Sequence, residues 1–159
     1  MGKTQIIAEA GIPQITVSRE FDAPRDLVFQ AYTDPELLVR WFGPRDETTT
    51  IDRHDLRDGG RWRYVTRDGE GNEFGFRGVF HGDQTPDGMV RTFEFEGVPG
   101  HVVLETTTLE ERDGRTLVRT VSSYQSVEDR DAMVASGMEH GVHESHERIE
   151  ELLAKLQAG

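Results

Sequence analysis

The segment from Ser136 to Leu156 constrains the fold most, because it has the pattern of a long amphipathic helix. Helical spacing of apolar residues begins at about Val127, and acidic residues lie in the first turn. Such a helix has to bury its apolar stripe against another element. The only other apolar surface of that size in the sequence is one face of a run of strands. We therefore expect a curved sheet that grips the helix and leaves a cavity between them.

Six strands are predicted between Glu47 and Tyr124, because five turn signals rich in glycine and proline divide this stretch. The short spacing allows only hairpin connections, which predicts an antiparallel meander. The alternating segment from Gln14 to Phe21, with Arg19 in the phase of the apolar residues, adds a strand and makes seven in all.

Aromatic and charged residues occupy opposite phases of the middle strands. This pattern predicts one dry and one solvated face. The aromatic phase holds Trp62, Tyr64, Phe74, Phe76, Phe80, Phe93 and Phe95, and the other phase holds Arg61, Arg63, Arg77, Glu94 and Glu96.

Two short helices are predicted between the first and second of the seven strands. Pro24 and Pro35 each mark a helix start, and Gly43 with Pro44 ends the second helix. The fold class is therefore α+β, with a seven-stranded antiparallel sheet curved around a long C-terminal helix. We predict a single domain over residues 14–157 and a flexible N-terminal segment over residues 1–13, which lack a partner pattern.

Composition excludes several classes of function. The length of 159 residues is typical of one domain with a sizeable core. A formal net charge of −12 argues against nucleic acid and anionic membranes as partners. The absence of cysteine excludes disulfides and a thiolate nucleophile. Because no signal peptide and no apolar run of about 18 residues is present, we expect a cytoplasmic protein.

The element order and three stretches carry a resemblance to a known family. The stretches are DAPRDLVFQAYTDPELLVRWFGP, GGRWRY and SGMEHGVHESHERIEELL. Together they resemble the bacterial homologues of the heat-shock-protein-90 ATPase activator, from about Ile15 to Leu156. That family belongs to the SRPBCC superfamily, so the resemblance implies the helix-grip fold of START domains and the birch pollen allergen. The superfamily includes lipid carriers, hormone receptors, polyketide cyclases and co-chaperone domains, so function has to be argued from the site.

Our first hypothesis is a cavity that binds a small hydrophobic or amphipathic ligand. Arg91 shares the phase of the aromatic residues, so it either lies at a strand end and extends to solvent or points inward to an acidic ligand. Tyrosine hydroxyls and indole nitrogens would orient the ligand. The predicted lining is Trp41, Phe42, Trp62, Tyr64, Phe76, Arg91, Phe93, Phe95, Tyr124, Met138 and Val142.

An enzyme has less support, because the sequence lacks a nucleophile elbow, a phosphate-binding glycine loop and a dinucleotide fingerprint. We assign no catalytic residue and predict no cofactor. A cyclase-like enzyme, as the resemblance implies, would use Tyr64, Arg91, Glu105 and Tyr124, and the phase of the Glu105 strand that faces inward is open.

Three histidines on the terminal helix raise the possibility of a metal site. Their spacing of three residues, at His140, His143 and His146, drifts around the helix and does not bring all three to one ion. We therefore predict no metal site and interpret the first two as partners of Glu144 and Glu147. Gly137 and Gly141 interrupt one face of the helix, and we expect them to allow close approach of the sheet, a helix or a ligand.

A third hypothesis is a protein-interaction module, with a chaperone or another protein as partner. The acidic face of the terminal helix would supply its surface. That face carries Glu139, Glu144, Glu147, Glu150 and Glu151. Such a charge run is more often simply a solvated face. The sequence allows a monomer or a homodimer.

Overall fold

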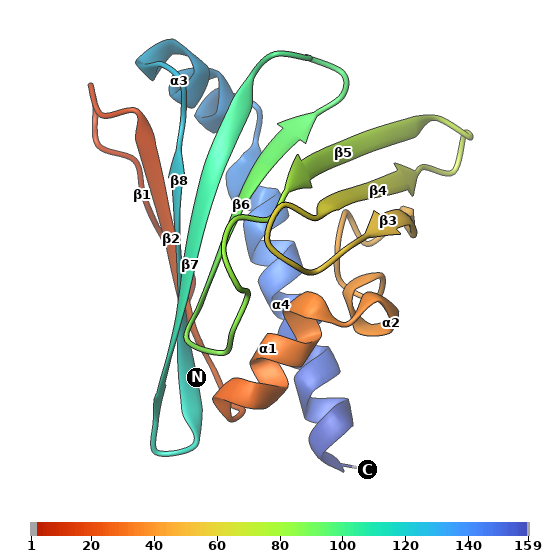
Figure 1. The fold of residues 1–159 in the computed structure, drawn as a ribbon, viewed down its shortest axis with the longest axis vertical. Coiled ribbons are helices and arrows are strands. Elements are labelled where there is room, and N and C mark those ends of the chain that lie inside the picture. The colour runs from red at the N-terminus through yellow and green to blue at the C-terminus, as the bar shows by residue number, and fades with distance from the viewer. Residues whose placement is uncertain (1–2, 159) are drawn as a thin grey trace.

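An antiparallel sheet of eight strands curves around the long helix α4 in the computed structural model of the protein, which describes residues 3–158 (Figure 1). The strand order is β1-β2-β8-β7-β6-β5-β4-β3. The strands are β1 Gln5–Ile7, β2 Gln14–Phe21, β3 Thr48–His54, β4 Arg61–Arg67, β5 Glu73–Val79, β6 Gly88–Phe95, β7 Val102–Arg112 and β8 Arg115–Ser123. The helices are α1 Arg25–Thr33, α2 Pro35–Leu38, α3 Val127–Ala135 and α4 Met138–Ala158.

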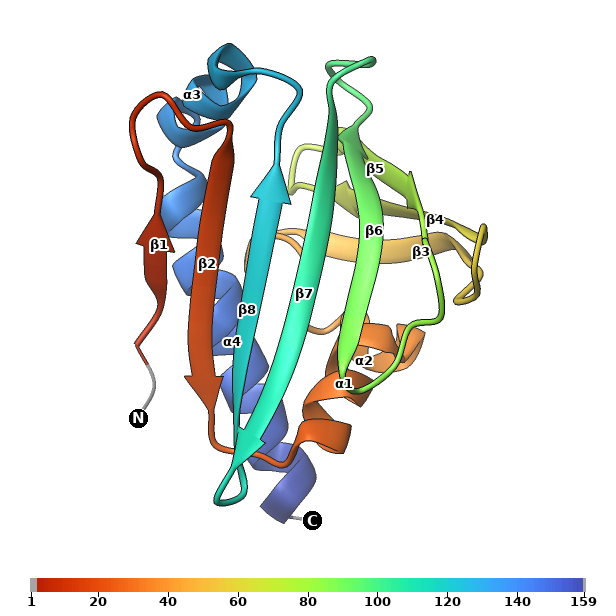
Figure 2. The same ribbon diagram turned by 60° about the vertical axis from the view of Figure 1, so that its left-hand side comes forward.

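The predicted count of seven strands is wrong by one. The additional strand is β1, which pairs antiparallel with β2 so that Ile6 lies opposite Val17 (Figure 2). A strand of three residues carries too little alternation to be recognised in the sequence. The two short helices consequently follow the second strand and precede β3. Residues 1 and 2 of the segment predicted to be flexible lie outside the described residues, and the flexibility of the segment stays a prediction.

The end of the chain forms two helices, and the prediction of one helix from Val127 is wrong. Gly137 has a φ of 85°, which ends α3 and turns the chain into α4. Ser126 caps α3 by accepting a hydrogen bond from the Asp129 amide at 3.0 Å. Close approach at Gly141 is also wrong, because a Cβ atom there would meet no atom within 4 Å.

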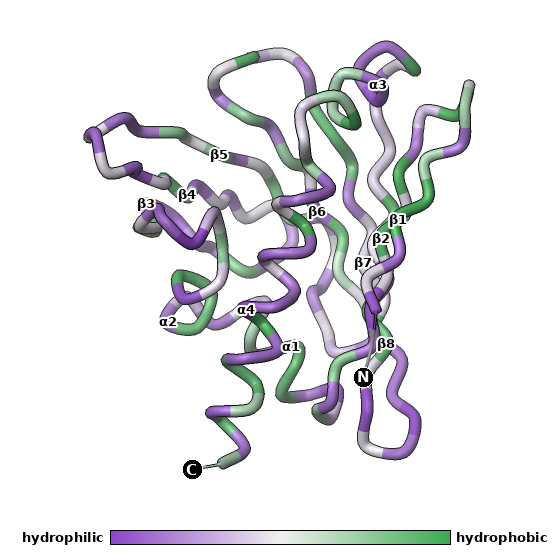
Figure 3. The backbone as a smooth tube through the Cα atoms, turned by 180° about the vertical axis from the view of Figure 1, so that it is seen from behind, coloured by the Kyte–Doolittle hydropathy of each residue, from purple (hydrophilic) through white to green (hydrophobic). Residues whose placement is uncertain are grey.

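The inner face of α4 packs on one half of the sheet. Figure 3 shows hydrophobic and hydrophilic residues alternating along this helix. The first hydrophobic cluster joins α4 and α1 to β2, β7 and β8, with Leu153, Val28 and Phe21 fully buried. A second cluster lies under α2 and contains Leu38, Trp62, Tyr64 and Phe80. The core is therefore divided into two parts, with half-buried Trp41 packed against both.

The loop after α2 holds the second cluster in place. The indole of Trp41 donates a hydrogen bond to the Ala31 carbonyl at 2.7 Å. Gly43 has a φ of 85° and lies against Thr66 of β4. Arg148 of α4 donates to the Gly43 carbonyl at 2.7 Å, which ties this loop to the long helix.

The outer face of the second half of the sheet is solvated and paired, as the alternation predicted. Arg63 binds Glu96 at 2.7 Å, and Arg77 binds Glu94 at 3.2 Å. Arg77 and Glu94 face each other on the neighbouring strands β5 and β6, and the Arg63–Glu96 pair reaches across β5. Within residues 3–158, no helix has the length and apolar character needed to cross a membrane.

Candidate functional site

The concave face of the sheet carries an ion pair on its central strands. The register aligns Ser122 of β8 with Glu105 of β7, and Glu105 with Arg91 of β6. This row begins at Ile15 of β2, which is 1% exposed, so the row faces the interior. The Arg91 Nε donates to the Glu105 carboxylate at 2.8 Å. Arg91 and Glu105 therefore both point inward, although the sequence alone left the direction of each side chain open.

The ion pair remains accessible to solvent although it faces the interior. The side chains of Arg91 and Glu105 are 24% and 21% exposed, whereas neighbouring Trp62 and Tyr64 are each 1% exposed. The guanidinium carbon of Arg91 lies 4.2 Å from the centre of the Trp62 ring, which is stacking distance. A polar, solvent-accessible region thus lies beside the aromatic cluster.

His54 is a member of this region that the sequence did not reveal. A β-bulge between Ile51 and Arg53 changes the phase of β3 and aligns His54 with Trp62 on the inner face. The His54 Nε2 donates to the Thr33 carbonyl at 2.7 Å. Burial lowers the pKa of His54, so the ring is neutral at pH 7 and its Nδ1 accepts from the Tyr64 hydroxyl at 2.9 Å. Simple alternation along β3 gives no signal for this phase change.

Tyr64 is oriented by this contact. Its hydroxyl proton points to His54, which leaves the oxygen lone pairs available to the guanidinium of Arg91. Burial raises the pKa of Tyr64 to about 12 against the opposing charge of Arg91. Tyr64 is consequently a neutral group of fixed orientation at pH 7.

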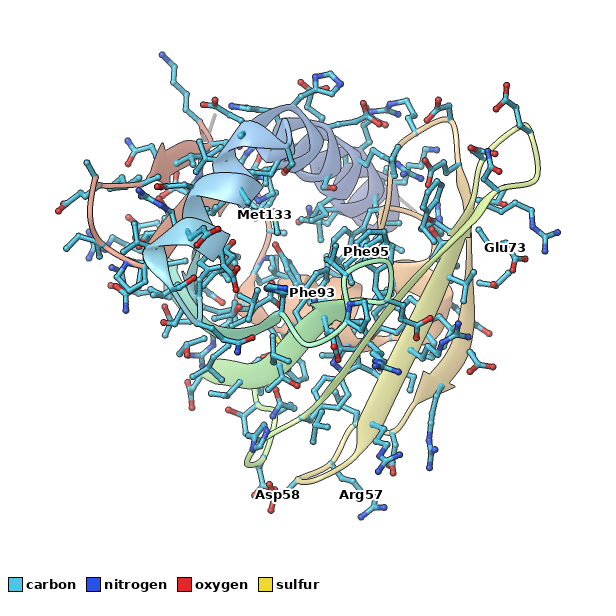
Figure 4. The ribbon with its side chains drawn as sticks, turned by 90° about the horizontal axis from the view of Figure 1, so that it is seen from above. Arg57, Asp58, Glu73, Phe93, Phe95 and Met133 are labelled. Carbon is cyan, nitrogen blue, oxygen red and sulfur yellow. The ribbon has the colours of Figure 1, made fainter. Side chains whose placement is uncertain are left out.

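Most of the predicted aromatic residues form a continuous wall. Phe42 lies edge-on to Tyr64 and Phe76, with ring centres 5.2 and 5.6 Å apart. Phe76 continues to Phe93 and Phe95 at 5.7 and 5.3 Å. Viewed from above, Phe93 and Phe95 lie near the centre of the molecule, whereas Arg57, Asp58 and Glu73 lie at its edge (Figure 4). These side chains form one aromatic cluster, and their role as the lining of a ligand cavity stays a prediction.

Three predicted residues lie at the margin of this region. Tyr124 follows β8 and is half-buried, and burial together with the charge of Glu105 raises its pKa to about 12. Met138 and Val142 are half-buried in the first turns of α4, and neither belongs to the two hydrophobic clusters described above. Tyr124 is thus close enough to respond to Glu105, while the two α4 residues are not joined to the aromatic wall.

Tyr32 of α1 is a second residue that the sequence did not select. Its ring lies 5.1 Å from that of Trp41 and packs against the first hydrophobic cluster. Burial raises the pKa of Tyr32, and the charges of Arg19 and Arg91 oppose this effect. The hydroxyl is therefore neutral and lies within electrostatic reach of both arginines and of Glu105.

The three histidines of α4 do not converge. His146 is buried, its Nδ1 lies 2.7 Å from the Thr4 hydroxyl, and its ring is edge-on to Phe21. The side chain of His140 is 87% exposed and contacts Glu144 at 3.4 Å. Among the described residues, no group of three or more histidine, cysteine or acidic side chains has a geometry that would hold a metal ion.

The acidic face of α4 is partly engaged by the chain itself. Glu144 accepts a hydrogen bond from the Arg45 amide, and Glu151 binds the Arg45 guanidinium at 3.0 Å. A hollow of about 210 Å³ beside this pair is lined by Arg40, Arg45, Arg148, Glu151, Leu152 and Lys155. A second hollow, of about 440 Å³, lies over the outer face of β3 to β6 and contains the ion pairs of Arg63 and Arg77. Part of the acidic face is thus paired within the chain, and its role as a partner surface stays a prediction.

A family model described as "Activator of Hsp90 ATPase homolog 1-like protein" matches residues 22–154. A crystal structure from Rhodobacter sphaeroides is 26% identical, covers 96% of this chain and 99% of its own, and has a TM-score of 0.88. A solution structure from Arthrobacter aurescens is 27% identical, covers 95% and 91%, and has a TM-score of 0.86. A crystal structure from Mycobacterium smegmatis is 25% identical, covers 96% and 97%, and has a TM-score of 0.85. No curated protein sequence matches the chain.

Proposed function

We propose that this chain, which belongs to the family of activator of Hsp90 ATPase homolog 1-like proteins, binds a small hydrophobic or amphipathic molecule between the concave face of its sheet and α4. The observation that carries the proposal is the inward-facing Arg91–Glu105 pair, which stays accessible to solvent beside a wall of aromatic side chains. An apolar wall with a few convergent polar groups is the usual composition of a small-molecule site.

Stability alone does not account for this ion pair. Replacing a buried ion pair by apolar side chains is often neutral or stabilising, by about 1–4 kcal/mol, and a pair exposed to solvent contributes only about 0–1 kcal/mol. A half-buried pair such as this one therefore adds little to stability. Arg91 and Glu105 occupy the row between Ile15 and the aromatic cluster, where apolar side chains would continue the core. Their presence there supports a role in contacting a ligand.

The surroundings of Arg91 indicate how such a ligand would be oriented. The apolar part would lie on Phe76 and Phe93, whose rings are tilted by 36° to one another. The polar part would meet Arg91 and the Tyr64 hydroxyl, which His54 holds in one orientation. A preorganised polar end next to an aromatic surface favours amphipathic molecules over purely apolar ones.

Ligand binding is tested by native mass spectrometry of freshly purified protein and by thermal shift with lipids, flavonoids and polyketides. A bound molecule stabilises the protein in proportion to the logarithm of its concentration above Kd. We expect Phe93→Ala to remove the shift produced by a ligand. The control is Leu104→Ala on β7, which removes a 43% exposed side chain from the outer face and should leave the shift intact. Equal shifts in both variants would contradict binding at the aromatic wall.

A co-chaperone role is the alternative that the family itself supports. It predicts saturable, salt-sensitive association with Hsp90 that survives Phe93→Ala, because the surface involved would lie outside the interior. Surface plasmon resonance with purified Hsp90, in parallel with the thermal-shift screen, separates the two functions.

A cyclase-like activity is a third candidate, and the contact between His54 and Tyr64 favours it over other chemistry. The hydroxyl of Tyr64 donates to the imidazole at 2.9 Å and accepts from Arg91, so it would hold the Arg91 guanidinium in place to polarise a carbonyl group of a bound chain. Turnover of a polyketide that disappears in Tyr64→Phe, while the compound still binds, would establish this activity.

A further inference from the structure

Arg19 occupies an apolar position in the middle of β2. It shares the inward phase with Ile15 and Phe21, which are 1% and 0% exposed. The residue opposite Arg19 on β8 is Val118, which is also buried. The guanidinium carbon lies 5.3 Å from the centre of the Phe21 ring. The charge of Arg19 is thus directed into the interior and away from the solvated face of the sheet.

Arg19 lacks the counter-ion that an inward-facing arginine ordinarily has. Within residues 3–158, no carboxylate oxygen lies within 4.0 Å of its nitrogens, and its buried Nε makes no hydrogen bond. Arg91 has Glu105 at 2.8 Å, and Arg130 has Asp131 at 2.6 Å. The Nε is buried while the residue as a whole is half-buried, so an unpaired guanidinium faces inward and remains available to a ligand.

The groups around Arg19 do not neutralise it. His146 faces Arg19 from α4, and burial with the Arg19 charge lowers the pKa of His146 to about 4, so the ring is neutral at pH 7. Tyr32 faces Arg19 from α1 and is neutral as well. Arg91 and Glu105 cancel each other. Glu150 of α4 also has buried carboxylate oxygens, but it forms no ion pair with Arg19 in the described part of the chain. Arg19 therefore has no group of opposite charge within contact distance in the described part of the chain.

We propose that the ligand carries a carboxylate, which binds Arg19 and accepts a hydrogen bond from the Tyr32 hydroxyl. This inference rests on the proposed ligand-binding function and specifies its chemical class as an anionic amphipath. Its apolar body would extend along Trp41, which packs against both hydrophobic clusters, toward Phe93. The path from β2 to β6 crosses three inter-strand spacings, about 14 Å, so the class comprises molecules with a medium-length chain or fused rings.

Matched probes that differ only in the polar group test this assignment. We would measure binding of decanoate and 1-decanol, and of 2-naphthoate and 2-naphthol, by isothermal titration calorimetry at pH 7.5. The wild-type protein should prefer the acid of at least one pair by about 10- to 100-fold, because hydrogen bonds to charged groups contribute about 1.5–3 kcal/mol. Arg19→Gln should abolish this preference and leave the affinity for the alcohol within about twofold.

Two further variants show whether the effect belongs to the site. Arg119→Gln removes an exposed arginine from the outer face of β8 and should keep the preference for the acid. Tyr32→Phe removes only the proposed hydrogen-bond donor and should reduce the preference by about two- to tenfold. Arg19→Gln should not lower the melting temperature of the ligand-free protein, since it removes an unpaired charge from the interior.

The outcomes separate this inference from the proposed function. Equal affinity for acid and alcohol in the wild type would overturn the carboxylate assignment and leave ligand binding intact. A loss of both affinities in Arg19→Gln would also overturn it, because the arginine would then act on packing. If neither pair binds while a compound of the thermal-shift screen does, the carboxylate assignment fails and the proposed function stands; if no compound binds, both fail.

Discussion

His146 is expected to make the stability of the protein fall as the medium becomes acidic. The imidazole is buried on the inner face of α4, edge-on to Phe21, and its Nδ1 is 2.7 Å from the Thr4 hydroxyl. Burial is the main cause of its lowered pKa, and the charges of Arg19 and His143 act in the same direction. Protonating this ring would place a second positive charge beside Arg19.

The magnitude follows from the shift in pKa. The pKa falls from 6.5 to about 4, and a shift of one unit corresponds to about 1.36 kcal/mol. The product is a loss of about 3 kcal/mol. Because the pKa is lower in the folded state, the unfolded chain binds the proton first, so stability is complete above pH 6.5 and falls as the pH decreases toward 4. A loss of this size is a large fraction of the stability of an ordinary domain, about 5–15 kcal/mol.

Urea unfolding at pH 7.5 and pH 4.5 measures this effect in the wild type and in His146→Gln. The variant should be less stable at pH 7.5, because it loses the aromatic contact with Phe21. Its further loss on going to pH 4.5 should be smaller than that of the wild type by about 2–3 kcal/mol, because the glutamine does not titrate. His140→Gln changes an exposed ring and serves as the control. A parallel decline in the wild type and His146→Gln, or an imidazole pKa near 6.5 for His146 by NMR titration, would refute the reasoning.

Two further predictions concern the loops that frame the interior. Asp129 of α3 raises the pKa of His101 across a 3.0 Å contact. This contact joins α3 to the start of β7, so it should hold at pH values below about 6.5 and weaken as the pH rises through the raised pKa. Hydrogen exchange of α3 should show this pH dependence in the wild type and not in Asp129→Asn. Gly43→Ala should cost about 1–3 kcal/mol, because it forces a side chain into a φ of 85° and places a Cβ 2.9 Å from the Thr66 methyl carbon. Gly59→Ala has a similar φ of 77° and no atom within 4 Å, so urea unfolding should show a smaller cost there, and equal costs would contradict the effect of close packing at Gly43.

Period-two alternation allowed the sequence to predict most of the sheet and its two faces. In β4, Trp62 and Tyr64 are buried as expected, and Arg63 between them binds Glu96 on the outer face. The same regularity explains the failure at His54, because the bulge in β3 shifts the phase by one residue and nothing in the local sequence marks it. Alternation reports a face only while the ladder remains regular.

The helical end of the chain shows a different limit of prediction from the sequence. Gly137 was visible in the sequence as an interruption, but the residue type alone did not distinguish a close approach from a break. The φ of 85° and the absence of a neighbour within 4 Å identify it as a break. Arg19 likewise lay in the correct phase for an inward position, yet only the three-dimensional arrangement reveals that it has no carboxylate partner among residues 3–158.

The distribution of charge inside the molecule separates the residues that stabilise the fold from those available for function. The apolar contacts lie in two clusters, one around Leu153 and one around Trp62. Arg91 and Glu105 lie in the row from Ile15 toward the second cluster, and Arg19 lies against Phe21 and Val118 of the first. Desolvation makes such charged side chains poor contributors to stability. The chain as a whole carries a formal net charge of −12, so two inward-facing arginines stand out against its acidic composition. A fold selected for packing alone would place apolar side chains at these positions, and the inward-facing charges at Arg19, Arg91 and Glu105 therefore support the proposed binding of a ligand there.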